Sequence, residues 1–178
     1  MTKFLHLTAF FVILTFVSST SIRAQSRAIG TAYSFSGISL VYDHEVNNGC
    51  FIELALKGEM GEVLAGRSCI PGISASFTWN YILKEWKISD DETLEMFAGP
   101  GVSMGYAKDL KRDKGFDFGL KGRFGIEFLF ERKAIISLSI SPVIGSHVEF
   151  NGNAINIRSY NYGLLNSIMP EIGIKYRF

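Results

Sequence analysis

The sequence predicts an all-β fold: a closed antiparallel up-and-down transmembrane β-barrel of eight strands, preceded by a cleaved signal peptide. Three observations lead to this prediction. Apolar and polar residues alternate with a period of two along most of the chain. The polar side of each alternation mixes charged residues with glycine and serine, whereas the apolar side is bulky and aromatic. Short and long polar connections follow each other between the alternating runs.

The N-terminal segment has the pattern of a secretory signal. An apolar run, Phe4–Val17, follows Lys3 and is in turn followed by a small residue, Ala24. A basic start, an apolar stretch of about 7–15 residues and a small residue at the cleavage site are typical of exported proteins. The run is also shorter than the roughly 20 residues that a membrane-spanning helix needs. We therefore expect residues 1–24 to be a signal peptide and residues 25–178 to be one barrel domain.

Charge and cysteine content exclude some classes of function. Removal of residues 1–24 leaves 16 basic and 17 acidic residues, without a basic cluster. Nucleic acid is therefore not an expected partner. Cys50 and Cys69 fall near opposite ends of a predicted hairpin. Because a disulfide needs Cα atoms within about 7 Å, we expect two free thiols.

The first predicted strand is Arg27–Ser34, "RAIGTAYS", with a tight turn after it. An exported barrel leaves its N-terminus in the periplasm, so its number of strands should be even, and an open sheet edge cannot face hydrocarbon. Seven other runs are evident, so this segment supplies the eighth strand. An alternative stays open, in which Arg27–Val46 is one long strand and the eighth strand lies within Glu149–Asn166.

Seven period-2 runs follow, separated by residues that favour turns. They are Gly37–Val46, Cys50–Met60, Gly72–Leu83, Leu94–Tyr106, Phe116–Phe130, Ala134–Val148 and Ile168–Phe178. The clearest is Phe116–Phe130, in which phenylalanines alternate with Asp117, Lys121, Arg123 and Glu127. No helical period is evident in residues 25–178.

The small polar-side residues decide which face of each strand points inward. A soluble sandwich also alternates, but it has one wet face and one packed face. A membrane barrel has an apolar outer band and a polar interior. We therefore expect the charged residues to line the lumen as one network: Glu53, Lys57, Glu59, Glu95, Asp117, Lys121, Arg123, Glu127, Glu171 and Lys175.

The predicted lumen charges are interleaved in sign. With Asp43, Glu45 and Arg177, the inward set holds eight acidic and five basic residues. Because unpaired buried charges cost several kcal/mol each, we expect paired groups and a plugged lumen. Eight strands leave little more than space for side chains. A narrow, weakly cation-preferring channel is the alternative.

The connections and outward aromatics predict how the barrel lies in a membrane. Periplasmic turns are short and external loops are long in such barrels. Asn47–Gly49, Glu85–Glu92 and Glu131–Lys133 are therefore predicted to be periplasmic, and Glu62–Pro71, Lys108–Gly115 and Glu149–Asn166 external. Lys108–Gly115 and Glu149–Asn166 are the expected contact surfaces for an unidentified extracellular ligand. The aromatic girdles are expected to contain Tyr33, Trp79, Tyr81, Tyr106 and Tyr176.

Three motifs carry a family resemblance: "FAGPGVSMGY" (Phe97–Tyr106), "GLKGRFGIEFLF" (Gly119–Phe130) and "PEIGIKYRF" (Pro170–Phe178). With them the chain resembles the small OmpA-type eight-stranded outer-membrane barrels, and especially the outer-membrane β-barrel domain proteins of the Bacteroidetes. The resemblance implies an outer-membrane location, contact with lipid and lipopolysaccharide, and folding by the barrel-assembly machinery. It also implies an assembly signal for that machinery, made of Ile172, Ile174, Tyr176 and Phe178.

The candidate catalytic residue is His147, with Ser146 and Glu149 beside it in sequence. Barrel enzymes that modify lipid A can use such a histidine at the external rim. However, general-base catalysis needs a placed nucleophile or water, and no His-x-Ser signature follows. We therefore expect an ordinary rim histidine in a protein that is not an enzyme, with a lipid A-modifying enzyme as the alternative. Neither a cofactor nor a metal is predicted, since His44 and His147 are far apart in sequence.

Overall fold

The computed structural model describes residues 26–60, 72–109, 114–151, 154–166 and 169–178. The predicted signal peptide, the predicted external loop Glu62–Pro71 and Cys69 lie outside these ranges. So does the middle of the predicted loop Lys108–Gly115. None of the helices in the described ranges is long and apolar enough to cross a membrane.

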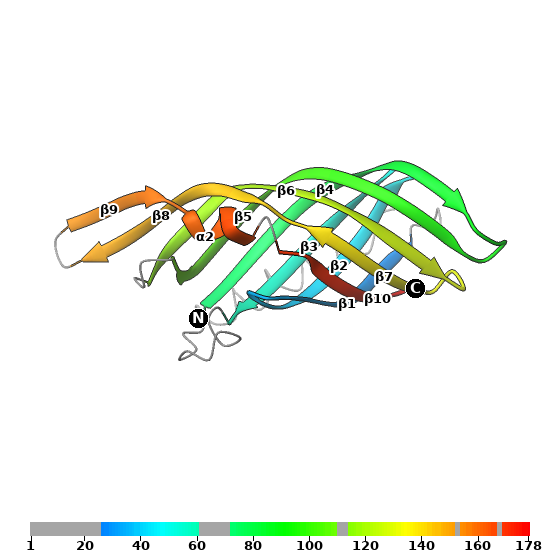
Figure 1. Ribbon diagram of the computed structural model, residues 1–178, viewed down its shortest axis with the longest axis horizontal. Helices are drawn as coiled ribbons and strands as arrows, with labels where there is room; N and C mark the ends of the chain where they lie inside the picture. The colour runs from blue at the N-terminus through cyan, green and yellow to red at the C-terminus, as the bar shows by residue number, and fades with distance from the viewer. Residues whose placement is uncertain (1–25, 61–71, 110–113, 152–153, 167–168) are drawn as a thin grey trace, which may run out of the picture.

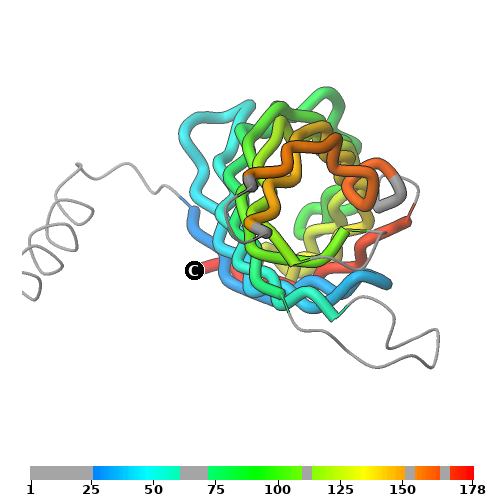
Figure 2. The backbone as a smooth tube through the Cα atoms, turned by 90° about the vertical axis from the view of Figure 1, so that its left-hand side faces the viewer, coloured from blue at the N-terminus to red at the C-terminus, as the bar shows by residue number. Residues whose placement is uncertain are grey.

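The described chain is a curved antiparallel sheet that closes on itself (Figures 1 and 2). Its elements are β1 Arg27–Ser34, β2 Gly37–Asn47, β3 Cys50–Glu59, β4 Gly72–Lys87, β5 Thr93–Lys108, β6 Lys114–Phe130, β7 Ala134–Ile140, β8 Val143–Asn151, β9 Ala154–Ser159, α2 Asn161–Asn166 and β10 Glu171–Arg177. Neighbouring strands pair from β1 to β6, and β10 pairs with both β1 and β7. Because β6 pairs with β7, the ring is complete.

Strands β7 and β8 together form one barrel strand. Both pair with β6, and the register of Phe124 with Ile140 continues as that of Lys121 with Val143. The interruption falls at Ser141 and Pro142. Proline has no N–H to donate to a ladder, which explains the break. The barrel therefore has eight strands, and the predicted fold class is confirmed.

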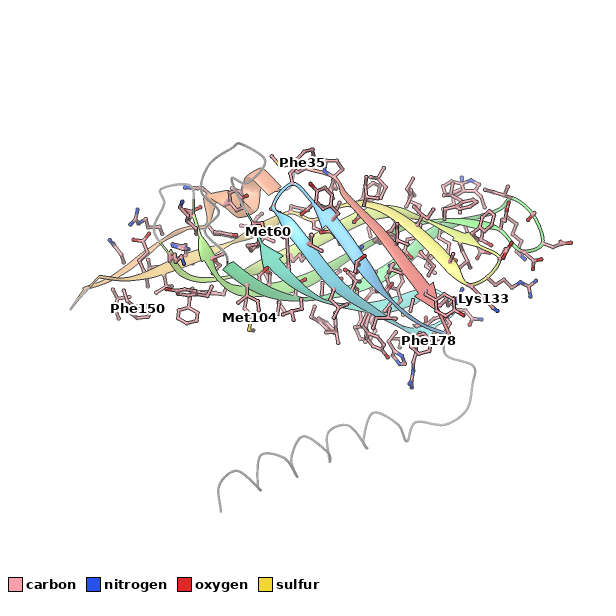
Figure 3. The ribbon with its side chains drawn as sticks, turned by 90° about the horizontal axis from the view of Figure 1, so that it is seen from below. Phe35, Met60, Met104, Lys133, Phe150 and Phe178 are labelled. Carbon is pink, nitrogen blue, oxygen red and sulfur yellow. The ribbon has the colours of Figure 1, made fainter. Side chains whose placement is uncertain are left out.

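Side-chain exposure confirms which face of the sheet points inward. On β6, Phe118 and Phe124 are 54% and 47% exposed, whereas Arg123 and Glu127 are 3% and 7% exposed. The same alternation holds on the neighbouring strands, so aliphatic and aromatic side chains cover the outside (Figure 3). The structure thus excludes a soluble sandwich, which would bury the phenylalanines and wet the charged face.

The N-terminal segment forms two strands, as predicted. β1 has the predicted bounds, Arg27–Ser34, and it pairs with β2 through a turn at Phe35 and Ser36. The alternative with one long strand over Arg27–Val46 is therefore wrong. Cys50 is buried and free, as expected, and its Sγ lies 3.0 Å from Oδ1 of Asn47.

The segment Glu149–Asn166 differs from the predicted polar loop. β8 continues to Asn151, and β9 pairs with it in an antiparallel hairpin that extends the sheet beyond the barrel (Figure 1). The short helix α2 follows, although no helical period was evident in the sequence. Six residues make fewer than two turns, too few for an apolar stripe to be recognised. The predicted turn Glu85–Glu92 is also shorter than expected, since β4 runs to Lys87.

Candidate functional site

The middle of the lumen is filled by charged side chains of both signs. Arg123 of β6 forms an ion pair with Glu53 of β3, and each side chain is only 1% exposed. Lys175 of β10 lies with its Nζ 2.6 Å from a carboxylate oxygen of Glu127 and 3.9 Å from one of Glu53. It also forms an ion pair with Asp43 of β2. Two cations thus share three carboxylates, and the five residues come from four strands, β2, β3, β6 and β10.

Two phenylalanines pack against these cations inside the barrel. The rings of Phe51 and Phe97 meet edge to face, with centroids 5.4 Å apart. The Arg123 guanidinium lies 5.0 Å from the Phe97 ring centroid, and the Lys175 ammonium lies 5.7 Å from that of Phe51. Cations over aromatic faces attract the ring quadrupole. We call the set Asp43, Phe51, Glu53, Phe97, Arg123, Glu127 and Lys175 the central layer.

Sequence reasoning missed the two phenylalanines of the central layer. Both lie on the polar side of their alternations, and Phe97 comes between Glu95 and Gly99. A signal was available in the opposing glycine, since a Cβ at Gly125 would come within 2.9 Å of the Phe97 ring. The inward glycine makes room for a large side chain on the neighbouring strand.

A second polar group lies between the central layer and the external end. Lys57 pairs with Glu59 at 3.7 Å, and Ser74 donates to Glu59 at 2.8 Å. Lys121 donates to Ser76 at 2.9 Å. Serine hydroxyls thus provide hydrogen bonds to Glu59 and Lys121, in addition to the ion pair that Glu59 makes with Lys57.

Two small cavities flank the central layer. The external cavity has a volume of about 60 Å³ and is lined by Lys57, Lys121, Glu171 and Tyr160 among others. The periplasmic cavity is also about 60 Å³, and Glu95 contributes to its wall. Each has room for a few water molecules. Glu95 and Glu171 have no ion-pair partner within the described part of the chain, so the predicted network is divided rather than continuous.

His147 lies in the external mouth of the lumen, but it is fully buried. Its Nδ1 contacts the carboxylate of Asp117, and its Nε2 lies 3.5 Å from Glu149. Its ring stacks on that of Tyr160, with centroids 6.4 Å apart. Glu149 also pairs with Arg158 of β9. The sequence predicted a rim position for His147 but not its burial, which arises because Tyr160, in the segment after β9, covers its ring.

The surroundings of His147 favour a structural role. Ser146 is its neighbour on β8, and successive strand residues point to opposite faces of the sheet, so the Ser146 hydroxyl points away from the ring. A general base must reach the proton that it removes from a bound substrate. The buried ring instead joins β6, β8 and the residue after β9. Burial raises the pKa of Tyr160 above its ordinary value.

Helix α2 is held against the external end of the barrel. The backbone N–H of Tyr162 donates to the Asp109 carboxylate at 2.9 Å, and the N–H of Tyr160 donates to the Gly145 carbonyl at 2.9 Å. Gly163 and Tyr160 contribute to the wall of the external cavity. Viewed along the barrel, this segment lies at the rim of the opening (Figure 2).

The remaining predicted site residues lie on the outer surface. Tyr33, Tyr81, Tyr106 and Tyr176 are exposed, and Trp79 is half-buried on the same face. Ile172, Ile174 and Phe178 are exposed along the last strand and its end. These positions suit girdle and assembly-signal roles, which stay predictions.

Comparison with known proteins gives a fold match without a sequence match. No protein family matches the chain, and neither does any curated protein. The N-terminal β-barrel domain of Pseudomonas aeruginosa OprF is similar in structure, with a TM-score of 0.50 and 8% identity over 86% of this chain and 96% of that one. Ail, the attachment invasion locus protein of Yersinia pestis, aligns over 86% of this chain and 94% of its own, with a TM-score of 0.34 and 14% identity.

The OprF match bears on the fold alone, because the identity is low. None of these matches tests the resemblance to Bacteroidetes proteins, which stays a prediction. With the ring closure and the inverted exposure pattern described above, the chain has the fold of an eight-stranded, OmpA-like outer-membrane β-barrel.

Proposed function

We propose that the protein is an integral outer-membrane barrel with a sealed lumen, which acts structurally or through its external surface and not as a channel or an enzyme. The central layer is the observation that carries the proposal. Its charged groups are paired, and its phenylalanines fill the section between the two cavities. Eight strands enclose an interior that side chains can fill.

An ion that crossed this barrel would have to separate buried pairs. The Arg123–Glu53 pair is 1% exposed on both sides, and Lys175 is bound by three carboxylates. Removal of one partner from a buried pair costs about 3–5 kcal/mol. Spontaneous opening by this route would therefore be rare, and a steady current is not expected.

The location in the outer membrane is supported by the surface of the barrel. Large apolar side chains are exposed over its outer face, from Phe116 to Phe130 on β6 and from Ile136 to Ile140 on β7. Such an apolar outer face is unfavourable in water but matches the acyl chains of a membrane. The predicted signal at residues 1–24 and the C-terminal Phe178 suit export and assembly by the barrel-assembly machinery. Phospholipid and lipopolysaccharide would then surround the protein.

The proposed contact surface for an extracellular partner includes the β8–β9 hairpin. Strands β8 and β9 are joined by the Arg158–Glu149 ion pair, and the ring of the buried His147 stacks on that of Tyr160 just after β9. A rigid projecting element is ordered before a partner binds, which lowers the entropic cost of recognition. The partner itself is not identified.

Planar-bilayer recording tests the sealed lumen. The purified, folded protein should give no large steady conductance. The double variant Arg123→Ala/Lys175→Ala serves as a positive control, since it removes both cations of the central layer and should raise the current. Stable large currents from the unaltered protein would contradict the proposal.

Membrane fractionation with heat-modifiable gel mobility tests the location. The protein should appear in the outer-membrane fraction, and its unheated form should migrate faster than its heated form. Recovery of the protein in the soluble periplasmic fraction would contradict the proposed place.

A further inference from the structure

Two prolines and a glycine lie side by side on the outward face of the sheet. Pro100 of β5 is paired with Gly122 of β6, and the N–H of Gly122 donates to the Pro142 carbonyl at 2.8 Å. The row therefore runs from β5 across β6 to the junction between β7 and β8. Each proline lacks a backbone donor, so each weakens the ladder on its side.

The pairing pattern shows both weak points. The β4–β5 ladder is continuous to Thr78 with Gly101 and resumes at Tyr81 with Ala98, which leaves Pro100 unpaired on that side. The ladder between β6 and the joined strands β7 and β8 has a gap between the Lys121–Val143 and Phe124–Ile140 pairs, and Pro142 lies in this gap. The register is unchanged across both gaps, so the strands continue without a bulge there.

An apolar groove of about 600 Å³ lies over this row on the outer face. Its walls include Leu120, Phe124, Ile140 and Ile144, and Gly99 and Gly122 lie in its floor. A Cβ at Gly122 would meet only the Pro142 ring, at 3.4 Å, so the space above this glycine is open. The groove exists because a residue without a side chain lies between two prolines at the centre of the sheet.

We propose that this groove binds one acyl chain of a phospholipid. The inference rests on the proposed membrane location, since the groove opens on the lipid-facing surface. Its volume falls in the range of roughly 300–1,000 Å³ that is typical of small-molecule sites. Van der Waals contacts hold acyl chains against the protein surface. A groove that no acyl chain fills makes fewer of these contacts. A chain that lies in the groove therefore exchanges more slowly than its neighbours on the smoother parts of the barrel.

The other end of β7 offers a site for the headgroup phosphate. Lys133 precedes β7 and is exposed, at the end of the molecule that also holds Phe178 (Figure 3). Its neighbour Arg132 is paired with Asp91 at 2.9 Å, whereas Lys133 has no ion pair within the described part of the chain. A phosphate beside Lys133 would complement this charge.

The distance between Lys133 and the groove suits an acyl chain. About eight strand residues separate Lys133 from Pro142, which at 3.3 Å per residue and a tilt of about 40° is roughly 20 Å along the barrel axis. Half of the hydrocarbon core is about 15 Å thick, and the lysine side chain spans the remainder. Ile136, Leu138 and Ile140 form an exposed apolar track between the two points. Because Lys133 lies in a turn predicted to be periplasmic, the expected ligand is a phospholipid of the periplasmic leaflet rather than lipopolysaccharide.

Native mass spectrometry of the folded full chain tests the site. The protein in detergent is mixed with palmitoyl-oleoyl-phosphatidylethanolamine in one arm and with lipopolysaccharide in the other. We expect one retained phospholipid per protein, and about tenfold less retention in Gly122→Phe, whose ring fills the groove. The control is Gly58→Phe, which adds the same ring on the outer face of β3, where a Cβ meets only the Ile38 carbonyl oxygen at 3.8 Å.

Two further variants keep the test decisive if Gly122→Phe does not fold. Ile144→Ser removes an exposed wall of the groove, and Lys133→Glu repels a phosphate, so both should also lower phospholipid retention. Equal retention in the groove variants, the control and the unaltered protein would overturn the proposal. Preferential retention of lipopolysaccharide would overturn its choice of lipid. Lipid retention is measured by mass spectrometry and the sealed lumen by conductance. Failure of the lipid-site proposal can therefore be distinguished from failure of the sealed-lumen proposal.

Discussion

Replacement of Arg123 by methionine is the sharpest test of the central layer. Arg123 forms a buried ion pair with Glu53 and lies over the ring of Phe97. Methionine is flexible and apolar, so it can keep contact with the ring while it removes the charge. The variant therefore leaves Glu53 buried without its main partner but opens only a small void.

The expected loss of stability follows from the contacts of Glu53. Removal of one partner of a buried pair costs about 3–5 kcal/mol. Lys175 lies 3.9 Å from the same carboxylate and compensates part of the charge. We therefore expect the lower end, about 3 kcal/mol, which is roughly a 150-fold change in the folding equilibrium.

Reversible urea unfolding in lipid vesicles, followed by tryptophan fluorescence, measures this change. The matched control is Arg132→Met, which breaks the Arg132–Asp91 pair, with side chains 71% and 64% exposed. Such surface pairs contribute about 0–1 kcal/mol. The double variant Arg123→Met/Glu53→Met should regain most of the lost stability, since a buried pair replaced by apolar residues is often neutral. If Arg123→Met costs no more than Arg132→Met, the lumen is wet and the reasoning fails.

Three other changes test separate parts of the barrel. A Cβ at Gly99 would overlap the Trp79 carbonyl, so Gly99→Val should abolish the heat-modifiable folded form, whereas Gly58→Val, on the open outer face, should keep it. His147→Ala should make the β8–β9 hairpin sensitive to protease without changing the lipid A of the host membrane, and a changed lipid A profile would support the enzyme alternative. Because burial raises the pKa of Tyr160, the folded state keeps it neutral while the unfolded chain ionises it near pH 10. The stability that Tyr160 provides is therefore complete below about pH 10 and is lost above it, and Tyr160→Phe should reduce this alkaline loss in urea titrations.

The sequence alone was sufficient to identify the eight strands of the barrel and the side of each strand that faces inward. A strand that is shifted by one residue exposes its other face, so the alternation of Phe118 and Phe124 with Arg123 and Glu127 determines which side faces outward. The first strand, Arg27–Ser34, has a weaker alternation and was identified by parity. That argument worked because a closed sheet in hydrocarbon leaves no unpaired edge.

Partners and short elements were not predictable in the same way. His147 meets Asp117 because β6 and β8 pair them, and this register is not visible in either segment alone. β9 has six residues and α2 has six, too few for a period to stand out from a polar stretch. Phe97 was not recognised because alternation sorts residues by polarity, whereas a lumen is filled by volume, with large residues opposite glycine.

The last strand links closure of the barrel to completion of its central layer. β10 pairs with β1 on one edge and β7 on the other, and the backbones of Phe178 and Arg27 are hydrogen-bonded. The same strand brings Lys175 to Glu127 and Glu53. Until β10 docks, those carboxylates lack their shared cation.

Two roles can therefore be tested separately: that of the inward Lys175 in the central layer and that of the outward Phe178 in the predicted assembly signal. Lys175→Met should slow folding into pure lipid vesicles and lower stability, since the inward carboxylates stay uncompensated when the ring closes. Phe178→Ala should leave vesicle folding nearly unchanged, because the Phe178 side chain is exposed. It should lower the folded yield in cells if the predicted assembly signal that includes Phe178 is used there. Gel mobility measured in vesicles and in cells compares the two variants directly. Equal defects of both variants in both settings would show that the inward and outward faces of β10 do not act separately.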